Sequence, residues 1–295
     1  MAFHVTFWGV RGSIPTPGPL TSVYGGNTAC VEIRIDDALF ICDAGTGLRE
    51  LGIDLLSRGL GVVDAHFFFS HMHWDHIQGF PFFAPAYIPQ HRMRIYGPRA
   101  GDSRYHDLLS GQMESAYFPV DFADLGGHIE PADLGDGHRV IEGVDVTCVQ
   151  QNHPGTSWAY AFAKNGCRVV YATDSEIDGQ LPDPAAVRAN PAAPRAVPAS
   201  LVEFCRGADL LIADAQYTDD DYPTKVGWGH ARASTVVDLA VQAGVKQLAL
   251  YHHDPMRTDP QVDVIVDDCR KRAQSQGSEV FIFAAREGIE LRLDR

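Results

Sequence analysis

Short runs of β-branched and aromatic residues, each bounded by glycine, proline or aspartate, recur along the first third of the chain. Such runs predict strands, and they lie at residues 4–10, 30–36, 38–45, 65–70 and 92–98. The stretch LRELGIDLLSRG, residues 48–59, instead spaces its apolar residues at the period of a helix and ends at glycine. The first third therefore predicts a sheet whose strands are interrupted by a helix.

Two hairpin-like blocks follow, at residues 138–150 and 158–174. Beyond them the pattern predicts strands at 208–217 and 246–253, helices at 231–244 and 261–276, and closing strands at 279–284 and 289–293. Meanders of strands with helices between and after them predict an α+β fold, in which two packed sheets are flanked by helices.

One segment differs in composition from the rest of the chain. Residues 178–200 (DGQLPDPAAVRANPAAPRAVPAS) are rich in proline and alanine, and they look the least ordered. We expect an insertion or a long crossing loop there. A length of 295 residues fits one sizeable domain or two small ones. We expect a single domain that spans residues 1–295, with the segment inside it.

The stretch FFFSHMHWDHIQGF, residues 67–80, places metal-binding side chains directly after a predicted strand: His71, His73, Asp75 and His76. Imidazole nitrogen and carboxylate oxygen are natural ligands of zinc, and of iron or manganese at similar sites. Because side chains alternate along a strand, His71 and His73 are expected to point the same way and to bind one ion. Asp75 and His76 come where the chain turns, so we expect them to face a second ion.

Further candidate ligands stand at the ends of later predicted strands. His153 follows VTCVQQN, Asp174 ends CRVVYATD, and His252 follows KQLALY. A lone histidine after a strand is more often a core or surface residue than a ligand. An ordered set of such residues, all at strand ends, favours a metal site.

The stretch HMHWDH has the form HxHxDH and, with a later histidine, aspartate and final histidine, resembles the metallo-β-lactamase-fold hydrolases. The last third resembles the phosphodiesterase branch that includes ribonuclease Z. The stretches that carry this likeness are ADLLIADAQY (208–217), GHARAS (229–234) and LALYHHDP (248–255). The resemblance spans nearly the whole chain and implies a four-layer αββα sandwich.

The resemblance also implies a ligand set for two divalent transition-metal ions, zinc in the first place and manganese or iron(II) as alternatives. One ion would take His71, His73 and His153. The other would take Asp75, His76 and His252, and Asp174 would bridge the two. His253 is adjacent to His252 and leaves the choice of the last ligand open, although the position after the apolar strand favours His252.

Two such ions share a water, lower its pKa to near neutral and hold it as hydroxide for attack. The departing oxygen needs a proton, which a histidine oriented by a carboxylate can supply. The resemblance assigns His230 as this general acid and Asp214 as its partner, and Asp75 is counted with them as catalytic. The family usually has glutamate where this chain has Asp214. The alternative for Asp214 is a strand-end carboxylate that faces solvent.

Three weaker candidates would contact the substrate. Arg11 lies in a Gly/Pro loop, where it would bind a phosphate, or it is a solvated loop arginine. Trp228 lies two residues before His230 and would stack on a base, or it packs against its neighbours. His253 is the third candidate.

Charge bears on the class of substrate. The chain has 24 lysine and arginine residues against 38 acidic residues, for a formal net charge of −14. Because proteins bind long nucleic acids mostly by neutralising phosphates, such a partner is disfavoured. A small phosphodiester held by metal ions suits an acidic chain, and a homodimer stays open.

Composition limits the location of the chain. No apolar run approaches the roughly 18 residues that a membrane helix needs, and the N-terminus does not resemble a signal peptide. We therefore expect no membrane partner and a cytoplasmic location. The six cysteines have no CxxC spacing, which indicates buried thiols in place of a disulfide framework or a thiolate zinc site.

These observations predict a dinuclear-metal phosphodiesterase that acts on a cyclic nucleotide, a cyclic dinucleotide or a short oligonucleotide. A ribonuclease Z-like tRNA 3′-end endonuclease is the nearest alternative, and the acidic charge and the lack of a long basic insertion disfavour it. A carboxylic-ester or lactone hydrolase would use the same metals but has no evident need for Asp214 and His230. A diiron oxidoreductase of this fold would be expected to resemble HxExD, whereas this chain has histidine at position 73. A metal-free binding module would have lost its metal ligands, whereas all seven candidate ligands are present here.

Overall fold

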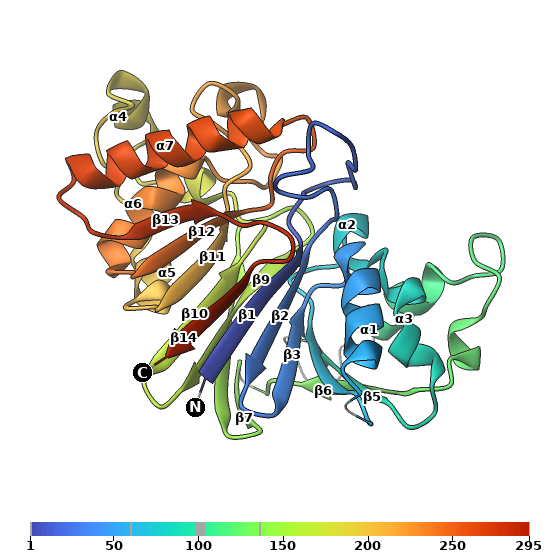
Figure 1. The fold of residues 1–295 in the computed structure, drawn as a ribbon. Coiled ribbons are helices and arrows are strands. Elements are labelled where there is room, and N and C mark those ends of the chain that lie inside the picture. The colour runs from blue at the N-terminus through green and yellow to red at the C-terminus, as the bar shows by residue number, and fades with distance from the viewer. Residues whose placement is uncertain (1, 60, 98–103, 136, 295) are drawn as a thin grey trace.

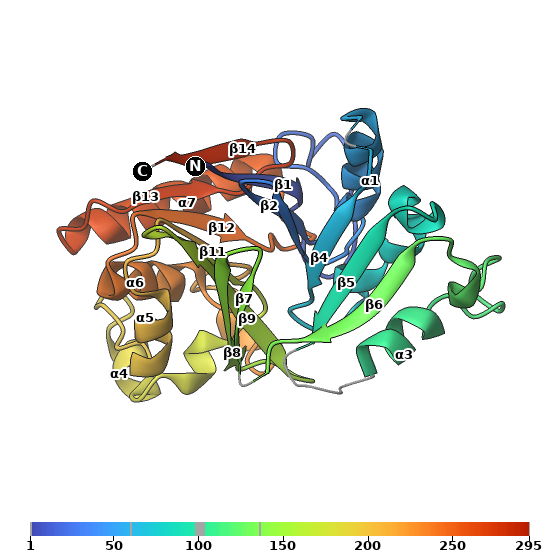
Figure 2. The same ribbon diagram turned by 90° about the horizontal axis from the view of Figure 1, so that it is seen from below.

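Two seven-stranded β-sheets face each other, and helices cover their outer faces (Figures 1 and 2). The computed structural model describes residues 2–59, 61–97, 104–135 and 137–294. The strand order is β14-β1-β2-β3-β4-β5-β6 in the first sheet and β13-β12-β11-β10-β9-β8-β7 in the second. This architecture is the predicted α+β, four-layer αββα sandwich.

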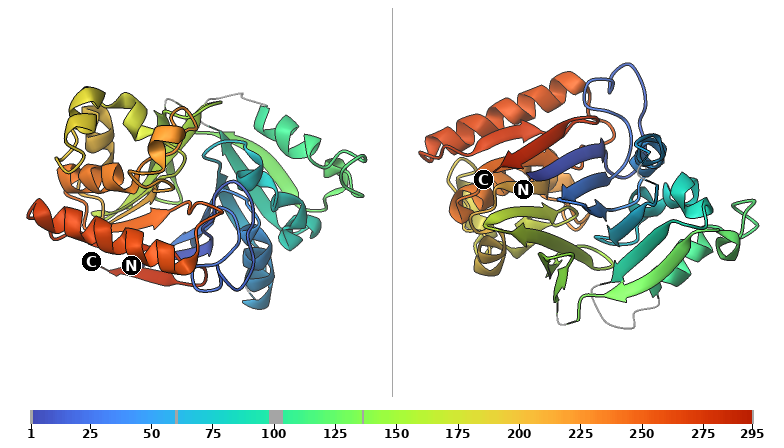
Figure 3. Two further views of the ribbon diagram at one scale, coloured as in Figure 1. Left: turned by 90° about the horizontal axis from the view of Figure 1, so that it is seen from above. Right: turned by 60° about the horizontal axis from the view of Figure 1, so that its bottom comes forward.

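The first sheet is antiparallel at one side and parallel at the other: β14, β1, β2 and β3 pair antiparallel, and β3 to β6 pair in parallel. Its strands are β1 (Ala2–Gly9), β2 (Cys30–Ile35), β3 (Ala38–Cys42), β4 (Asp64–Phe68), β5 (Arg92–Gly97), β6 (His128–Asp133) and β14 (Glu290–Asp294). Because Ala2 pairs with Asp294, the two ends of the described chain lie side by side (Figure 3).

The second sheet is mixed in the same way, with antiparallel pairing from β7 to β10 and parallel pairing from β10 to β13. Its strands are β7 (His138–Ile141), β8 (Val144–Gln151), β9 (Ser157–Lys164), β10 (Cys167–Ala172), β11 (Leu210–Asp214), β12 (Gln247–Tyr251) and β13 (Phe281–Ala284). The carboxyl ends of β10, β11 and β12 therefore meet at one edge, as parallel strands do.

Helices α1 and α3 lie outside the first sheet, and α5, α6 and α7 lie outside the second (Figure 2). The α-helices are α1 (Gly47–Ser57), α2 (Trp74–Ile77), α3 (Arg104–Gly111), α4 (Pro184–Ala189), α5 (Ala199–Cys205), α6 (Ala233–Ala243) and α7 (Asp259–Ser275). Short 3₁₀ helices occupy Phe80–Phe82, Ala84–Tyr87, Phe122–Asp124, Ile177–Gln180 and Tyr222–Thr224. Within the described residues, none of the helices is both long and apolar enough to span a bilayer.

Alternating side chains of each strand fill two different layers of the core. In β10, Val169 and Tyr171 pack between the sheets, whereas Val170 and Ala172 pack beneath the outer helices. A strand buried on both faces reads as a continuous apolar run. For this reason the segment CRVVYA was readily predicted as a strand.

The predicted strands and helices are present, with ends that shift by a few residues. The polar strand β6 was not predicted, because its sequence HIEPAD lies at the edge of the sheet and is largely exposed. The segment 178–200 also differs from the expected loop, since it holds α4 and the start of α5. Its Arg195 is buried and donates to Thr235 of α6 at 3.0 Å, which ties the segment to the fold.

Candidate metal centre and active site

The predicted ligands meet at the edge where the carboxyl ends of strands from both sheets come together, close to α2 (Figure 1). The loop between β4 and α2 supplies His71 and His73, and α2 itself supplies Asp75 and His76. His153, Asp174 and His252 follow the ends of β8, β10 and β12. His71 and His73 lie beyond β4, which ends at Phe68, so strand alternation does not orient them. Their rings nevertheless lie 4.3 Å apart.

Overlapping groups of side chains each bring their ligand atoms within 4.8 Å of one another. The groups are His71, His73 and His153; His71, His76 and Asp174; Asp75, His76 and His252; and Asp174, Asp214, His230 and His252. All seven predicted ligands therefore belong to one cluster, together with the predicted acid and its partner.

The spacing within the cluster suits ions held by several donors. His73 Nδ1 lies 3.2 Å from His153 Nε2, and His76 Nε2 lies 3.2 Å from His252 Nε2. Ligands at about 2.0–2.1 Å from a tetrahedral zinc ion lie roughly 3.3 Å from each other. The observed nitrogen pairs have this separation.

Asp174 lies between the two halves of the cluster. Its Oδ2 is 3.6 Å from His71 Nε2, and its Oδ1 is 3.3 Å from His252 Nε2. Each carboxylate oxygen thus faces a different half, as a bridging ligand requires. Its pKa lies well below the usual value, because the neighbouring histidines outweigh the opposing effect of burial.

One buried nitrogen of the cluster, Nε2 of His71, is in the state that binding of a metal ion requires. His71 Nε2 is buried and has no hydrogen-bond partner among the described residues, and such an atom normally costs about 1–3 kcal/mol of stability. Burial, and then the nearby His76, hold the pKa of His71 well below its usual value. A neutral imidazole with a free Nε2 is the form that binds a metal ion, so the donor set fits the implied ions.

The opposite ring nitrogens are engaged by groups that orient the imidazoles. His76 Nδ1 donates to Asp43 Oδ2 at 2.7 Å, and His153 Nδ1 donates to the Gly229 carbonyl at 2.8 Å. His252 Nδ1 lies 3.1 Å from Gln216 Oε1. Each contact leaves Nε2 free to face the cluster, as is usual for metal-binding histidines.

Asp43 and Ser13 were not predicted from the sequence. Asp43 directly follows the apolar strand β3 and has a φ of 60°, so an aspartate after a strand was the only available signal. The Ser13 amide donates to Asp75 Oδ2 at 2.7 Å. A Cβ on Gly12 would lie 2.5 Å from the His252 ring, so the loop after β1 approaches the site as glycine allows.

His230 and Asp214 form a buried pair beside the cluster. His230 Nδ1 lies 2.8 Å from Asp214 Oδ2, and the His230 ring stacks on the His252 ring with centroids 5.0 Å apart. Burial favours a low pKa for His230, but the charge and hydrogen bond of Asp214 outweigh it and raise the pKa to about 9. Asp214 is 1% exposed, so the alternative of a solvent-facing carboxylate does not hold.

Arg11 does not reach the site, which corrects its prediction as a substrate contact. The side chain is completely buried, and its guanidinium donates to the carbonyl oxygens of Gly25 at 2.7 Å and Arg257 at 2.8 Å. It also lies 3.5 Å from Asp259 Oδ1. The start of α7 and the residues just before it therefore cover Arg11 and bury it, although a Gly/Pro loop predicts exposure.

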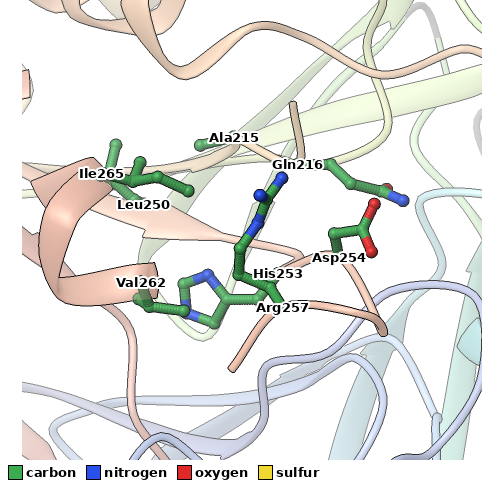
Figure 4. A pocket seen from close by; sticks show the side chains of 8 residues that line it. All are labelled: Ala215, Gln216, Leu250, His253, Asp254, Arg257, Val262 and Ile265. Atoms are coloured by element: carbon green, nitrogen blue, oxygen red, sulfur yellow. The ribbon is translucent and has the colours of Figure 1, made fainter. Parts of the chain in front are cut away.

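His253 is also turned away from the cluster, which corrects its prediction as a substrate contact. Its Nε2 lies 2.9 Å from the Ala285 carbonyl, and burial lowers its pKa to about 3. The ring lines a cavity of about 10 Å³ beside Arg257 and Val262 (Figure 4). That space holds about one water, so the geometry favours His252 as the residue of the cluster.

Trp228 is exposed near the site, as a substrate contact must be. Its side chain is 57% exposed, and Lys225 Nζ lies 3.9 Å from the centroid of its ring. A second tryptophan, Trp74, lies between His73 and Asp75 and is 75% exposed. Trp74 was not singled out in the sequence, although its place within HMHWDH was the available signal.

Comparison with known proteins identifies the family. Residues 40–253 match the family described as "Beta-lactamase superfamily domain". The chain belongs to this superfamily. Ribonuclease Z of Methanosarcina acetivorans is 26% identical over 91% of this chain and 92% of that protein. Ribonuclease Z of Haloarcula marismortui is 23% identical over 100% of this chain and 98% of that protein.

Solved structures show the same fold. The metallo-β-lactamase fold protein YhfI from Bacillus subtilis has a TM-score of 0.70 and 20% identity, and the match covers 99% of each chain. The short form of human tRNase Z has a TM-score of 0.62 and 18% identity, over 99% of this chain and 100% of that one. The predicted fold and the predicted resemblance are confirmed, and the relatives bear out the prediction of a hydrolase of this family.

Proposed function

We propose that the protein is a metal-dependent phosphodiesterase that cleaves a small or short substrate, such as a cyclic nucleotide, a cyclic dinucleotide or a short oligonucleotide. The observation that carries the proposal is the buried pair of His230 and Asp214, 2.8 Å apart, beside a cluster of seven candidate metal ligands. Metal sites of many hydrolases resemble this cluster. A protonated histidine beside the cluster is needed only where a poor leaving group departs.

Two ions fit the donor set. His71, His73 and His153 would hold one ion, Asp75, His76 and His252 would hold the other, and Asp174 would lie between them. Nitrogen and oxygen donors suit zinc, and they also accept manganese or iron(II). When bound, the ions supply Lewis acidity and a water of near-neutral pKa.

His230 would hold the proton for the departing oxygen. Because its Nδ1 is engaged by Asp214 Oδ2, the Nε2–H is the group left to donate. The carboxylate also orients the ring and stabilises its charge. The shorter side chain of aspartate makes this contact from the end of β11, so the usual glutamate is not required.

The exposed ring of Trp228 would stack on a base or another flat group of the substrate. Stacking on an aromatic side chain contributes about 1–3 kcal/mol per base and tolerates different bases. The tryptophan lies in the same loop as His230, which places binding and proton donation on neighbouring residues.

A tRNA 3′-end endonuclease is the second candidate, because proteins named ribonuclease Z align with most of this chain. A net charge of −14 works against it, since tRNA is bound through many phosphates. Hydrolysis of a carboxylic ester or lactone is a weaker alternative. Its departing alkoxide could take the same proton from His230, but the relatives that align with most of this chain are named ribonuclease Z.

A turnover screen of the purified, metal-loaded protein tests the proposal. The panel contains bis-p-nitrophenyl phosphate, cyclic mononucleotides, cyclic dinucleotides, a pre-tRNA and a lactone. We expect turnover of the phosphodiesters, with the cyclic or short nucleotides preferred over pre-tRNA, and loss of turnover in His71→Ala. Faster cleavage of the lactone than of every phosphodiester would overturn the proposal.

A further inference from the structure

A second buried carboxylate lies two residues beyond Asp174. Glu176 is 5% exposed, and its two oxygens accept three hydrogen bonds from one loop. The donors are Tyr222 Oη at 2.7 Å, the Gly227 amide at 2.8 Å and the Gly229 amide at 3.0 Å. One carboxylate therefore binds the loop that leads into His230.

The contacts bracket the exposed tryptophan. Gly227 and Gly229 have φ values of 84° and 89°, a conformation that favours glycine, and Trp228 lies between them. Each amide is bound by a different oxygen of Glu176. The carboxylate thus holds both backbone positions from which the Trp228 ring projects into solvent.

Gly229 also connects this loop to the cluster of candidate metal ligands. Its carbonyl accepts the hydrogen bond of His153 Nδ1, and a Cβ at this position would lie 2.2 Å from the same nitrogen. The backbone can approach His153 so closely only as glycine. The residue that follows is His230, so a small shift of Gly229 moves the proton donor relative to His153.

The far side of His230 is bound in a similar way. Asp178 Oδ2 accepts from the Arg232 amide at 2.8 Å, and Asp178 Oδ1 accepts from Arg232 Nε at 2.8 Å. The segment that follows β10 therefore supplies Asp174 to the cluster. It also supplies Glu176 and Asp178, whose carboxylates bind the backbone on the two sides of His230. Charge-assisted hydrogen bonds in a buried setting are the strong ones.

We propose that Glu176 is a positioning residue for the reaction: it holds the loop 227–230 so that the His230 imidazole and the Trp228 ring face the same bound substrate. The inference rests on the proposed role of His230 as the proton donor. A displacement of about 1 Å in such a group can cost about 100-fold in rate, which is why a buried carboxylate at this loop matters to the chemistry.

The test compares two diesters that differ in their leaving group and do not require the natural substrate. Bis-p-nitrophenyl phosphate releases a stable anion, whereas diphenyl phosphate releases a poorer one that benefits from a proton. In Glu176→Gln, an NH₂ group replaces one of the two oxygens and cannot accept the hydrogen bond from the backbone N–H of Gly227 or Gly229. We expect the loop to shift as a result. We expect kcat on diphenyl phosphate to fall about 10- to 100-fold, with a fall of less than about threefold on bis-p-nitrophenyl phosphate and with metal content retained.

Tyr222→Phe removes one donor of the three and should give a smaller loss with the same selectivity, which keeps the test open if Glu176→Gln fails to fold. Glu203→Gln is the matched control, because Glu203 is an exposed glutamate that pairs with Arg206 and lies outside the loop. The control should match the wild type on both diesters.

His230→Ala, measured in parallel, separates the two claims. If His230→Ala shows the leaving-group selectivity and Glu176→Gln does not, the positioning role is wrong and the proposed function stands. Equal losses on both diesters, or loss of metal, in Glu176→Gln would also overturn the positioning role. If His230→Ala itself shows no selectivity, there is no proton donor to position and the proposed mechanism is wrong as well.

Discussion

Asp43 Oδ2 accepts a hydrogen bond from His76 Nδ1 at 2.7 Å, and the same oxygen accepts from Ser70 Oγ at 2.7 Å and Tyr171 Oη at 2.6 Å. The contact turns His76 Nε2 toward Asp174 and His252. A carboxylate in this position orients the ring and raises its basicity toward a metal ion. We therefore expect Asp43 to support the candidate metal centre without facing the ions.

We expect Asp43→Asn to weaken binding of the metal ion at His76 by about 10- to 100-fold. Competition with a chelating indicator measures the dissociation constant. Asp36→Asn is the matched control, because Asp36 also has a positive φ but pairs with Lys164 far from the site. Asparagine tolerates this backbone conformation. Unchanged affinity in Asp43→Asn would limit Asp43 to a role in folding.

The metal content of the protein is the most direct check of the ligand set. We expect about two transition ions per chain in protein purified without chelator, and the loss of at least one ion in His73→Ala. Elemental analysis measures both. His138→Ala is the control, because His138 is an exposed histidine that contacts Asp145. Active protein with almost no metal would end the two-metal account.

The candidate ligands could be selected from the sequence because they form the stretch HxHxDH or follow later predicted strands. The local structure that brings these ligands together could not be predicted from the sequence. His71 and His73 meet through the loop after Phe68 and not through strand alternation. Asp43 and Glu176 could not be selected, because a lone acidic residue after a strand or in a loop has no pattern that separates it from a surface group.

Arg11 shows the limit of local composition. A loop rich in glycine and proline predicts exposure, yet the burial of Arg11 comes from contacts with Arg257 and Asp259, which lie at the other end of the chain. Sequence patterns over a short window contain no information on such contacts. The same limit kept His253 open beside His252, although the position after the apolar strand favoured His252.

A substitution at Arg11 tests its structural role. We expect Arg11→Met to lower the free energy of unfolding by about 2–4 kcal/mol, because buried carbonyl oxygens and Asp259 lose a charged donor. Chemical denaturation measures this change. Arg286→Met, at an exposed arginine, is the control and should have little effect. If Arg11→Met instead raises KM at unchanged stability, Arg11 is a substrate contact after all.

Binding of long RNA separates the two nucleic-acid hypotheses. An acidic chain with 24 basic residues should bind tRNA weakly at physiological salt. Titration with a labelled pre-tRNA over a range of salt concentrations measures the affinity and its salt dependence. Tight binding with a salt slope that corresponds to about six or more phosphate contacts would place the endonuclease first.

The role of His230 can be separated from that of the metal ligands by the leaving group. A general acid contributes about 10²–10⁴-fold, and only where the departing oxygen needs a proton. A nitrophenolate leaves without one, whereas a ribose alkoxide does not. We therefore expect His230→Ala to keep both ions and to lose far more activity on a nucleotide diester than on a nitrophenyl diester. Steady-state kinetics on both diesters, with metal analysis of each variant, measure this selectivity.

Asp214→Ala should show the same selectivity to a smaller extent, because Asp214 acts on the imidazole and not on the substrate. His71→Ala should lose both activities together, because the metal centre itself is damaged. Equal losses on both diesters in His230→Ala, with the ions retained, would mean that His230 shapes the pocket and donates no proton. The pair of His230 and Asp214 would then give no support to the proposed proton transfer.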